Sequence, residues 1–95
     1  MPQGKLLTFE VDREGDQLFI HGDAQGLRDL VASLQRLVTK ADAGEPDHDH
    51  LFSEEWGGHE LTSEAQSTDT AVRLIHHVKI YAWPTDEGAR AYRDA

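Results

Sequence analysis

The clearest helical pattern in this chain begins at Asp23 and ends before Ala43, and it constrains the fold more than any other feature. Six apolar residues recur at the i, i+3, i+4, i+7 spacing that places them on one face of a helix. They are Leu27, Leu30, Val31, Leu34, Leu37 and Val38. Asp23 suits the N-cap because its carboxylate can accept the free amide hydrogens of the first turn. We expect this helix to cover one face of a sheet.

The segments before the helix have the alternation of strands. Residues 5–12 alternate apolar and polar side chains, with Thr8 and Glu10 on the side opposite to the apolar ones. A turn-forming Arg-Glu-Gly-Asp follows, and residues 17–21 form a second short strand. The two strands together predict a hairpin.

After the helix, short strands are expected at residues 48–52 and 59–62, and a longer one at 71–83. In the longer strand, period two puts His76 on an apolar face and His77 on the other. The order of elements predicts an α+β fold: a small, mostly antiparallel sheet of about four to five strands with one amphipathic helix packed on one face. We expect one domain over residues 1–95, with its core in 5–83 and a short helix or frayed tail over 84–95.

The segment between residues 41 and 72 contains no Lys or Arg, although it carries nine carboxylates. Its centre, residues 48–61, combines acids and histidines with a tryptophan and a Gly-Gly turn. A solvated loop would mix both charge signs and would not include Trp or Leu-Phe. The segment is therefore suited either to a basic partner or to a metal ion.

The formal charge of the 95-residue chain is −9 with its six histidines neutral. Such a surface repels phosphate backbones, so we expect no nucleic-acid partner. It favours salt-sensitive association with basic partners, although acidity also serves simply to keep a small protein soluble. Residues 1–5 lack the regions of a secretory signal, and no apolar run approaches the ~20 residues of a membrane span. We expect a cytoplasmic protein without a membrane partner.

Histidines are the candidate metal ligands, because the chain has no cysteine. His48 and His50 flank Asp49, so both imidazoles project from the same face of an extended strand, a spacing suited to Zn²⁺. His59, or one of the adjacent pair His76 and His77, could supply a third nitrogen, with Asp47 or Glu60 as an oxygen ligand. The alternative is that these imidazoles form hydrogen bonds with neighbouring carboxylates at the surface.

Two further residues have both a functional and a structural interpretation. Trp56, next to the Gly-Gly turn, suits either an interface anchor or a place in the core. His77 is a candidate contact residue beside Lys79 and Tyr81, or an ordinary exposed strand residue. No nucleophile motif, phosphate loop or cofactor fingerprint is present, so we expect a protein that is not an enzyme and has no required cofactor.

Five short motifs, taken in order, resemble the immunity protein 32 family of bacterial polymorphic toxin systems. They are Gly22-Asp23-Ala24-Gln25-Gly26-Leu27-Arg28-Asp29-Leu30, His48-Asp49-His50-Leu51-Phe52, Glu55-Trp56-Gly57-Gly58, Glu60-Leu61 and Leu74-Ile75-His76-His77-Val78-Lys79-Ile80-Tyr81, and the similarity spans roughly residues 18–83. The resemblance implies an immunity protein that neutralises a cognate toxin protein by binding it.

Combined with the acidic segment, this resemblance predicts stoichiometric binding of a toxin with a basic surface. The expected partner-binding residues are Asp47, His48, Asp49, His50, Glu54, Glu55, Trp56, His59, Glu60 and His77. The alternative is a small zinc-binding domain built on His48, His50 and His59.

Overall fold

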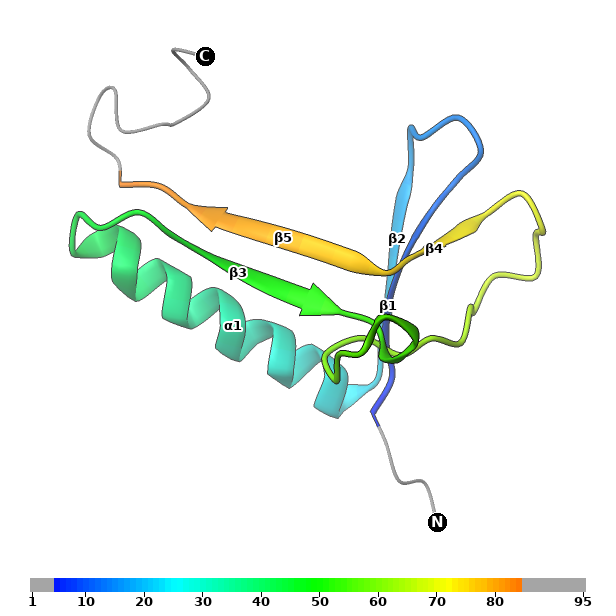
Figure 1. Ribbon diagram of the computed structural model, residues 1–95, viewed down its shortest axis with the longest axis horizontal. Helices are drawn as coiled ribbons and strands as arrows, with labels where there is room; N and C mark the ends of the chain where they lie inside the picture. Colours follow the sequence, from blue (N-terminus) through cyan, green and yellow to red (C-terminus); the bar gives the residue numbers. More distant parts are fainter. Residues whose placement is uncertain (1–4, 85–95) are drawn as a thin grey trace.

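The computed structural model describes residues 5–84 and has an α+β fold, as the sequence predicts (Figure 1). Its elements follow in the order β1 (Leu7–Val11), β2 (Leu18–Gly22), α1 (Ala24–Asp42), β3 (Asp47–Phe52), the short 3₁₀ helix η1 (Glu54–Trp56), β4 (Arg73–Ile75) and β5 (His77–Ala82). The strands form two small antiparallel sheets, one with the order β2-β1-β4 and one that pairs β3 with β5. The tail predicted over residues 84–95 lies outside the described residues except for Pro84.

The prediction of one long strand over residues 71–83 is wrong. The chain bends at His76, so that β4 pairs with β1 and β5 pairs with β3. Ser53 holds this bend: its N–H donates to the carbonyl oxygen of His76 (2.8 Å), and its hydroxyl is hydrogen-bonded to His76 Nδ1 (2.8 Å). Ile75 and Val78 both pack against the core, although a continuous strand would point them to opposite faces.

The strand predicted at residues 59–62 is also absent from the structure. Only an isolated bridge between Ser53 and Leu61 is formed there. The predicted turn at Trp56-Gly57-Gly58 is present, because η1 ends at Trp56 and Gly57 adopts a φ of 89°. Gly57 thereby occupies the left-handed region that glycine enters at no steric cost.

The helix begins as its sequence predicts, since the carboxylate of Asp23 accepts a hydrogen bond from the N–H of Gly26 (2.7 Å). Two glycines let it approach the first sheet closely. A Cβ atom at Gly26 would lie 1.9 Å from the carbonyl oxygen of Leu6, and one at Gly22 would lie 2.8 Å from the side chain of Leu27. The start of α1 is therefore seated directly on the backbone that leads into β1.

The core joins the two sheets. Leu7 and Phe9 of β1 cluster with Leu51 of β3 and with Leu61, and each of the four is at most 6% exposed. The opposite face of β1 is buried as well: Glu10 is fully buried and its carboxylate accepts hydrogen bonds from the N–H groups of Gln66 (2.8 Å) and Ser67 (3.2 Å). The loop after Leu61 thus covers the face of β1 that carries the polar residues Thr8 and Glu10.

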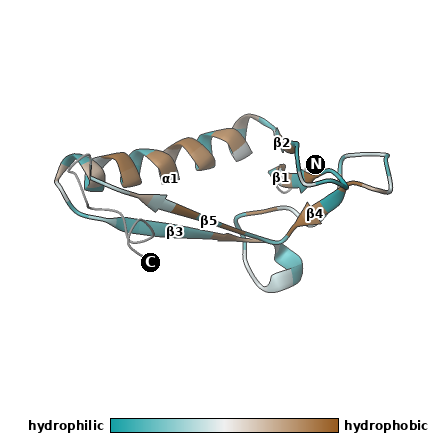
Figure 2. Cartoon of the chain, turned by 90° about the horizontal axis from the view of Figure 1, so that it is seen from above, coloured by the Kyte–Doolittle hydropathy of each residue, from teal (hydrophilic) through white to brown (hydrophobic). Residues whose placement is uncertain are grey.

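The second sheet, β3 with β5, lies along the helix, whereas β1 and β2 lead away from it at a steep angle (Figure 1). Figure 2 shows hydrophobic residues along α1 and in β5, while β3 is largely hydrophilic. Within residues 5–84, no helix has the length and apolar character needed to cross a membrane.

Candidate functional site

The candidate site is the face of the β3–β5 ribbon that points away from the helix. Side chains alternate along each strand, and Asp49 faces α1, where it accepts a hydrogen bond from the hydroxyl of Ser33. The neighbouring positions therefore face outward. The register of the ribbon pairs them as His48 with Tyr81, His50 with Lys79, and Phe52 with His77. We call these six residues the outer ribbon face.

The rings on the outer ribbon face form a continuous stack. Phe52 and His77 lie with ring centroids 4.3 Å apart and planes 8° apart, and His50 stacks on His77 at 5.1 Å. His48 meets His50 edge to face at 4.9 Å and lies 5.9 Å from Tyr81. A stack of this kind fixes its members in place, because each ring limits the rotation of the next.

A hydrogen bond between two imidazoles joins the strands within this stack. His50 Nδ1 lies 2.9 Å from His77 Nε2, so one nitrogen donates and the other accepts. Two imidazolium ions would face each other with hydrogens and no acceptor, so the contact requires at least one neutral ring. Burial lowers the pKa of His50, and the nearby charges of His48, Lys79 and His77 lower it further. The imidazole of His50 is therefore neutral at neutral pH.

A second group of predicted residues gathers at the end of the ribbon, where β3 leads into η1. Trp56 is 59% exposed and its ring stacks on His76 at 5.3 Å. His76 Nε2 lies 3.6 Å from a carboxylate oxygen of Glu55. His76 is therefore a partnered residue at a bend, and Trp56 is a surface ring held by it. Glu54 and Glu55 are both exposed on η1.

The predicted acids Asp47 and Asp49 lie on the other face of the ribbon, toward the helix. Arg36 bridges them, with N–O distances of 3.1 Å to Asp47 and 3.4 Å to Asp49. A hydrogen bond from the His48 N–H lowers the pKa of Asp47, helped by Arg36. Burial works against ionisation of Asp49, but the hydrogen bonds from Ser33 and the His50 N–H outweigh it, so that its pKa is lowered too. Both carboxylates hold α1 to β3.

Two other predicted residues are not members of the outer ribbon face. Glu60 is half-buried and accepts a hydrogen bond from the N–H of Phe52 (2.9 Å). His59 is exposed and lines a shallow hollow with Lys5, Gln25 and other residues at the start of the helix. The rings of His48 and His50 instead contact each other and the rings of Tyr81, Phe52 and His77. Within the described residues, no group of three or more His, Cys, Asp or Glu side chains is arranged to hold a metal ion.

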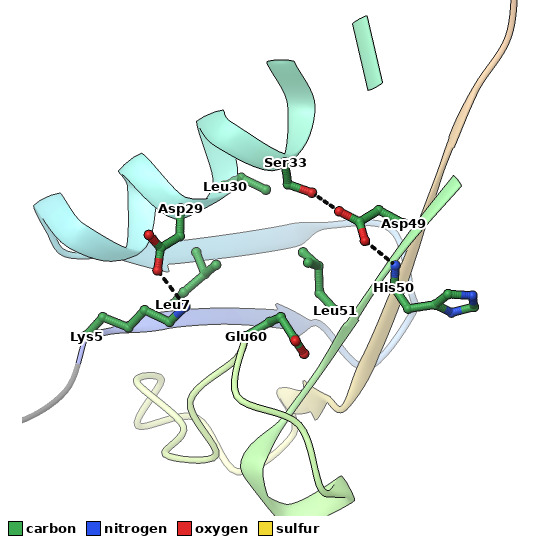
Figure 3. A pocket seen from close by; sticks show the side chains of 9 residues that line it. All are labelled: Lys5, Leu7, Asp29, Leu30, Ser33, Asp49, His50, Leu51 and Glu60. Atoms are coloured by element: carbon green, nitrogen blue, oxygen red, sulfur yellow. Dashed lines mark hydrogen bonds and ion pairs between the residues drawn. The ribbon is translucent and has the colours of Figure 1, made fainter. Parts of the chain in front are cut away.

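Figure 3 shows the hollow between α1, the start of β1 and β3, which has a volume of about 220 Å³. Its polar groups are already paired: Lys5 with Asp29 (2.7 Å) and Ser33 with Asp49. The imidazole of His50 points away from the hollow, to the other side of β3. Ligand pockets are usually larger and present unpaired polar groups. The hollow therefore offers little for a substrate.

Sequence reasoning missed the aromatic members of the outer ribbon face. Phe52 and Tyr81 were not among the expected partner-binding residues, and neither was Trp83, which stacks on Tyr81 at 5.7 Å. The sequence does indicate the two halves of this face, because alternate residues of a strand point to the same side. His48, His50 and Phe52 alternate in this way on one strand, and His77 and Tyr81 on the other. This pattern could be used only once the pairing of the two strands was known.

A family model described as Immunity protein 32 matches residues 17–78, about two thirds of the chain. The matched region contains α1, β3, η1, β4 and the first residues of β5. No curated protein and no solved structure matches the chain.

Proposed function

The chain belongs to the immunity protein 32 family, and on this basis we propose that it binds and neutralises a cognate bacterial toxin in the cytoplasm of the cell that makes it. The proposed action is stoichiometric: the immunity protein covers or distorts the toxin and catalyses nothing. Paired polar groups in the hollow beside α1 agree with a role that needs no substrate pocket.

We propose the outer ribbon face, together with Trp56, as the toxin-binding surface. The observation that carries this assignment is the stack of imidazole and aromatic rings on the side of the ribbon opposite to the helix. Interfaces are enriched in aromatic side chains, which supply contact area at a low cost in conformational entropy. Rings that already fix one another in the free protein lose little further freedom on binding.

Acidic residues around this surface favour a toxin whose contact surface is basic. Glu54 and Glu55 lie on η1 next to Trp56, in a stretch from position 41 to 72 that contains no Lys or Arg. By contrast, Asp47 and Asp49 are engaged by Arg36 and contribute through the field of the whole molecule rather than by direct contact. The association rate should fall steeply as salt is added, because the charges that steer the encounter are screened.

The experiment has two stages. The toxin candidate encoded beside this gene is first expressed in a test bacterium with and without the chain. Relief of toxicity and co-purification of the pair support the immunity function, whereas toxicity that persists with the folded chain present contradicts it for that pair.

The second stage maps the surface with matched histidine variants. His48→Ala removes a ring from the outer ribbon face, while His59→Ala removes an exposed imidazole from the hollow at the start of α1. We expect His48→Ala and Trp56→Ala each to raise the Kd about 10- to 100-fold, the range of interface anchors, and His59→Ala to leave it unchanged. Loss of affinity in His59→Ala alone would assign the toxin contact to the hollow that His59 lines and not to the outer ribbon face.

A further inference from the structure

The apolar face that the sequence gives to α1 is only half covered in the structure. Leu30 and Leu37 pack toward the sheets, but Leu27, Val31, Leu34 and Val38 remain 44%, 62%, 41% and 49% exposed. We call these four residues the open helix stripe. A soluble monomer rarely leaves a row of large aliphatic side chains in water along one element.

The spacing of the open helix stripe is that of a helix–helix seam. Its residues are separated by four, three and four positions, and Ala24 and Ala41 continue the pattern at both ends. This is the 3.5-residue repeat of a coiled coil, with Val at the a positions and Leu at the d positions. Val at a with Leu at d favours two helices over three or four.

The two other sides of α1 have different roles, so the stripe is not a by-product of folding. One side binds β3, through Ser33 and Arg36. The opposite side is exposed and largely polar, with Arg28, Gln35 and Thr39. The open helix stripe lies between them and serves neither the core nor solvation.

The apolar surface extends from the helix onto the first sheet. Leu27 lies against Gly22 at the end of β2. On the same face of that strand, Ile20 and Leu18 precede Gly22 by two and four residues. Ile20 is 47% exposed and Leu18 is 55% exposed. Figure 1 shows that the end of β2 leads directly into the start of α1.

We propose that the open helix stripe is a homodimer interface, with a second copy of this chain as its occupant and α1 packed on α1. The stripe and the two β2 residues expose on the order of 500 Å² per copy, so a symmetric dimer that covered all of this area would bury roughly 1,000 Å², which is the lower limit for a specific interface. A two-fold interface requires a surface that is complementary to itself, and a repeating Val/Leu seam has that property. The helix is already formed in each copy, so its nucleation costs the dimer nothing.

This dimer leaves the proposed toxin-binding surface accessible. His48, His50, Phe52 and His77 lie on the side of β3 and β5 away from α1, whereas the seam belongs to α1 itself. Tyr81 differs from them, because it lines a hollow with Leu34 and Val38 of the stripe. The proposal therefore does not depend on the immunity function, and its test needs no toxin.

The test measures the molar mass of the full chain by light scattering and by sedimentation equilibrium, over micromolar to high-micromolar concentrations. We expect the wild-type chain to have twice its monomer mass of 10.6 kDa. Val31→Asp and Val38→Asp place a charge in the seam and should yield monomers. Ala32→Asp adds the same charge one position away, outside the stripe, and should remain dimeric. Circular dichroism verifies that all three variants keep the helix.

Three results would overturn the proposal. One is a wild-type chain that stays monomeric at the highest concentration. Another is a dimer that persists in both folded Val→Asp variants, which would place the contact elsewhere. The third is an Ala32→Asp variant that keeps its helix but becomes monomeric, because the added charge would then act wherever it stands on α1 and not through the stripe.

Discussion

Gly26 provides the most informative stability prediction, because helix propensity and tertiary structure give opposite signs. Gly26 is a helical residue of α1, and replacing an interior helical glycine with alanine ordinarily stabilises a protein by about 1 kcal/mol. Here, however, the new Cβ would lie 1.9 Å from the carbonyl oxygen of Leu6, where ordinary contact begins at 3.4 Å. The helix would have to withdraw from β1.

Withdrawal strains two interactions at once. It lengthens the hydrogen bond from the N–H of Asp23 to the carbonyl oxygen of Leu6, now 3.0 Å, and it loosens the packing on Leu7, whose side chain is 1% exposed. A hydrogen bond contributes about 1 kcal/mol and overpacking costs about 1–3 kcal/mol, so Gly26→Ala should destabilise the fold by about 1–3 kcal/mol after the gain in propensity. In a domain of this size, that lowers the Tm by roughly 5–20 °C.

The matched control is Gly15→Ala. Gly15 has a φ of 77° and nothing within 4 Å of its added Cβ, so this variant carries backbone strain of about 1–2 kcal/mol without a clash. Urea and thermal unfolding followed by circular dichroism measure both variants. If Gly26→Ala proves as stable as the wild-type chain, the close seating of α1 on β1 is incorrect.

Two further predictions concern the core and the imidazole pair. Leu51→Ala should cost about 2–4 kcal/mol by leaving a cavity at the junction of the two sheets, whereas Gln35→Ala, on the exposed polar side of α1, should change the stability by about 0.5 kcal/mol or less. Equal losses in urea unfolding would contradict the core assignment. The lowered pKa of His50 means that the unfolded chain, with an ordinary value of 6.5, binds this proton first as the pH falls. Stability should therefore decrease as the pH falls from about 7.5 through 6.5 toward the folded-state pKa, and His50→Gln should remove that part of the slope while His59→Gln keeps it.

Local patterns predicted the fold class, the hairpin and the helix, because each depends on residues close in sequence. Capping chemistry identified the N-cap at Asp23, and the strand predicted at residues 48–52 is present as β3, which begins one residue earlier. The division into two sheets was not found, because the bend at His76 is held by Ser53, which is 23 residues away in the chain. No local pattern reports such a contact.

The same limit applies to the candidate site. The sequence analysis assigned the acids and histidines after residue 41 to one binding surface, but the structure divides them. Asp47 and Asp49 pair with Arg36 on the helix side of the ribbon, and His59 lines the hollow at the start of α1. The parity of His48 and His50 was correctly predicted, but the stack they form with His77 depends on strand pairing. Burial of the helix was overestimated for a related reason, since periodicity identifies an apolar face but not the element that covers it.

The central claim is that the outer ribbon face binds the toxin, and its most direct test is an NMR titration of the isotope-labelled chain with an inactive variant of its toxin. The account predicts that the largest shift changes and line broadening fall on the imidazole and aromatic side chains of His48, His50, Phe52 and His77 and on the indole of Trp56. Changes confined to α1 or to the surroundings of His59, with the ring stack unaffected, would contradict it.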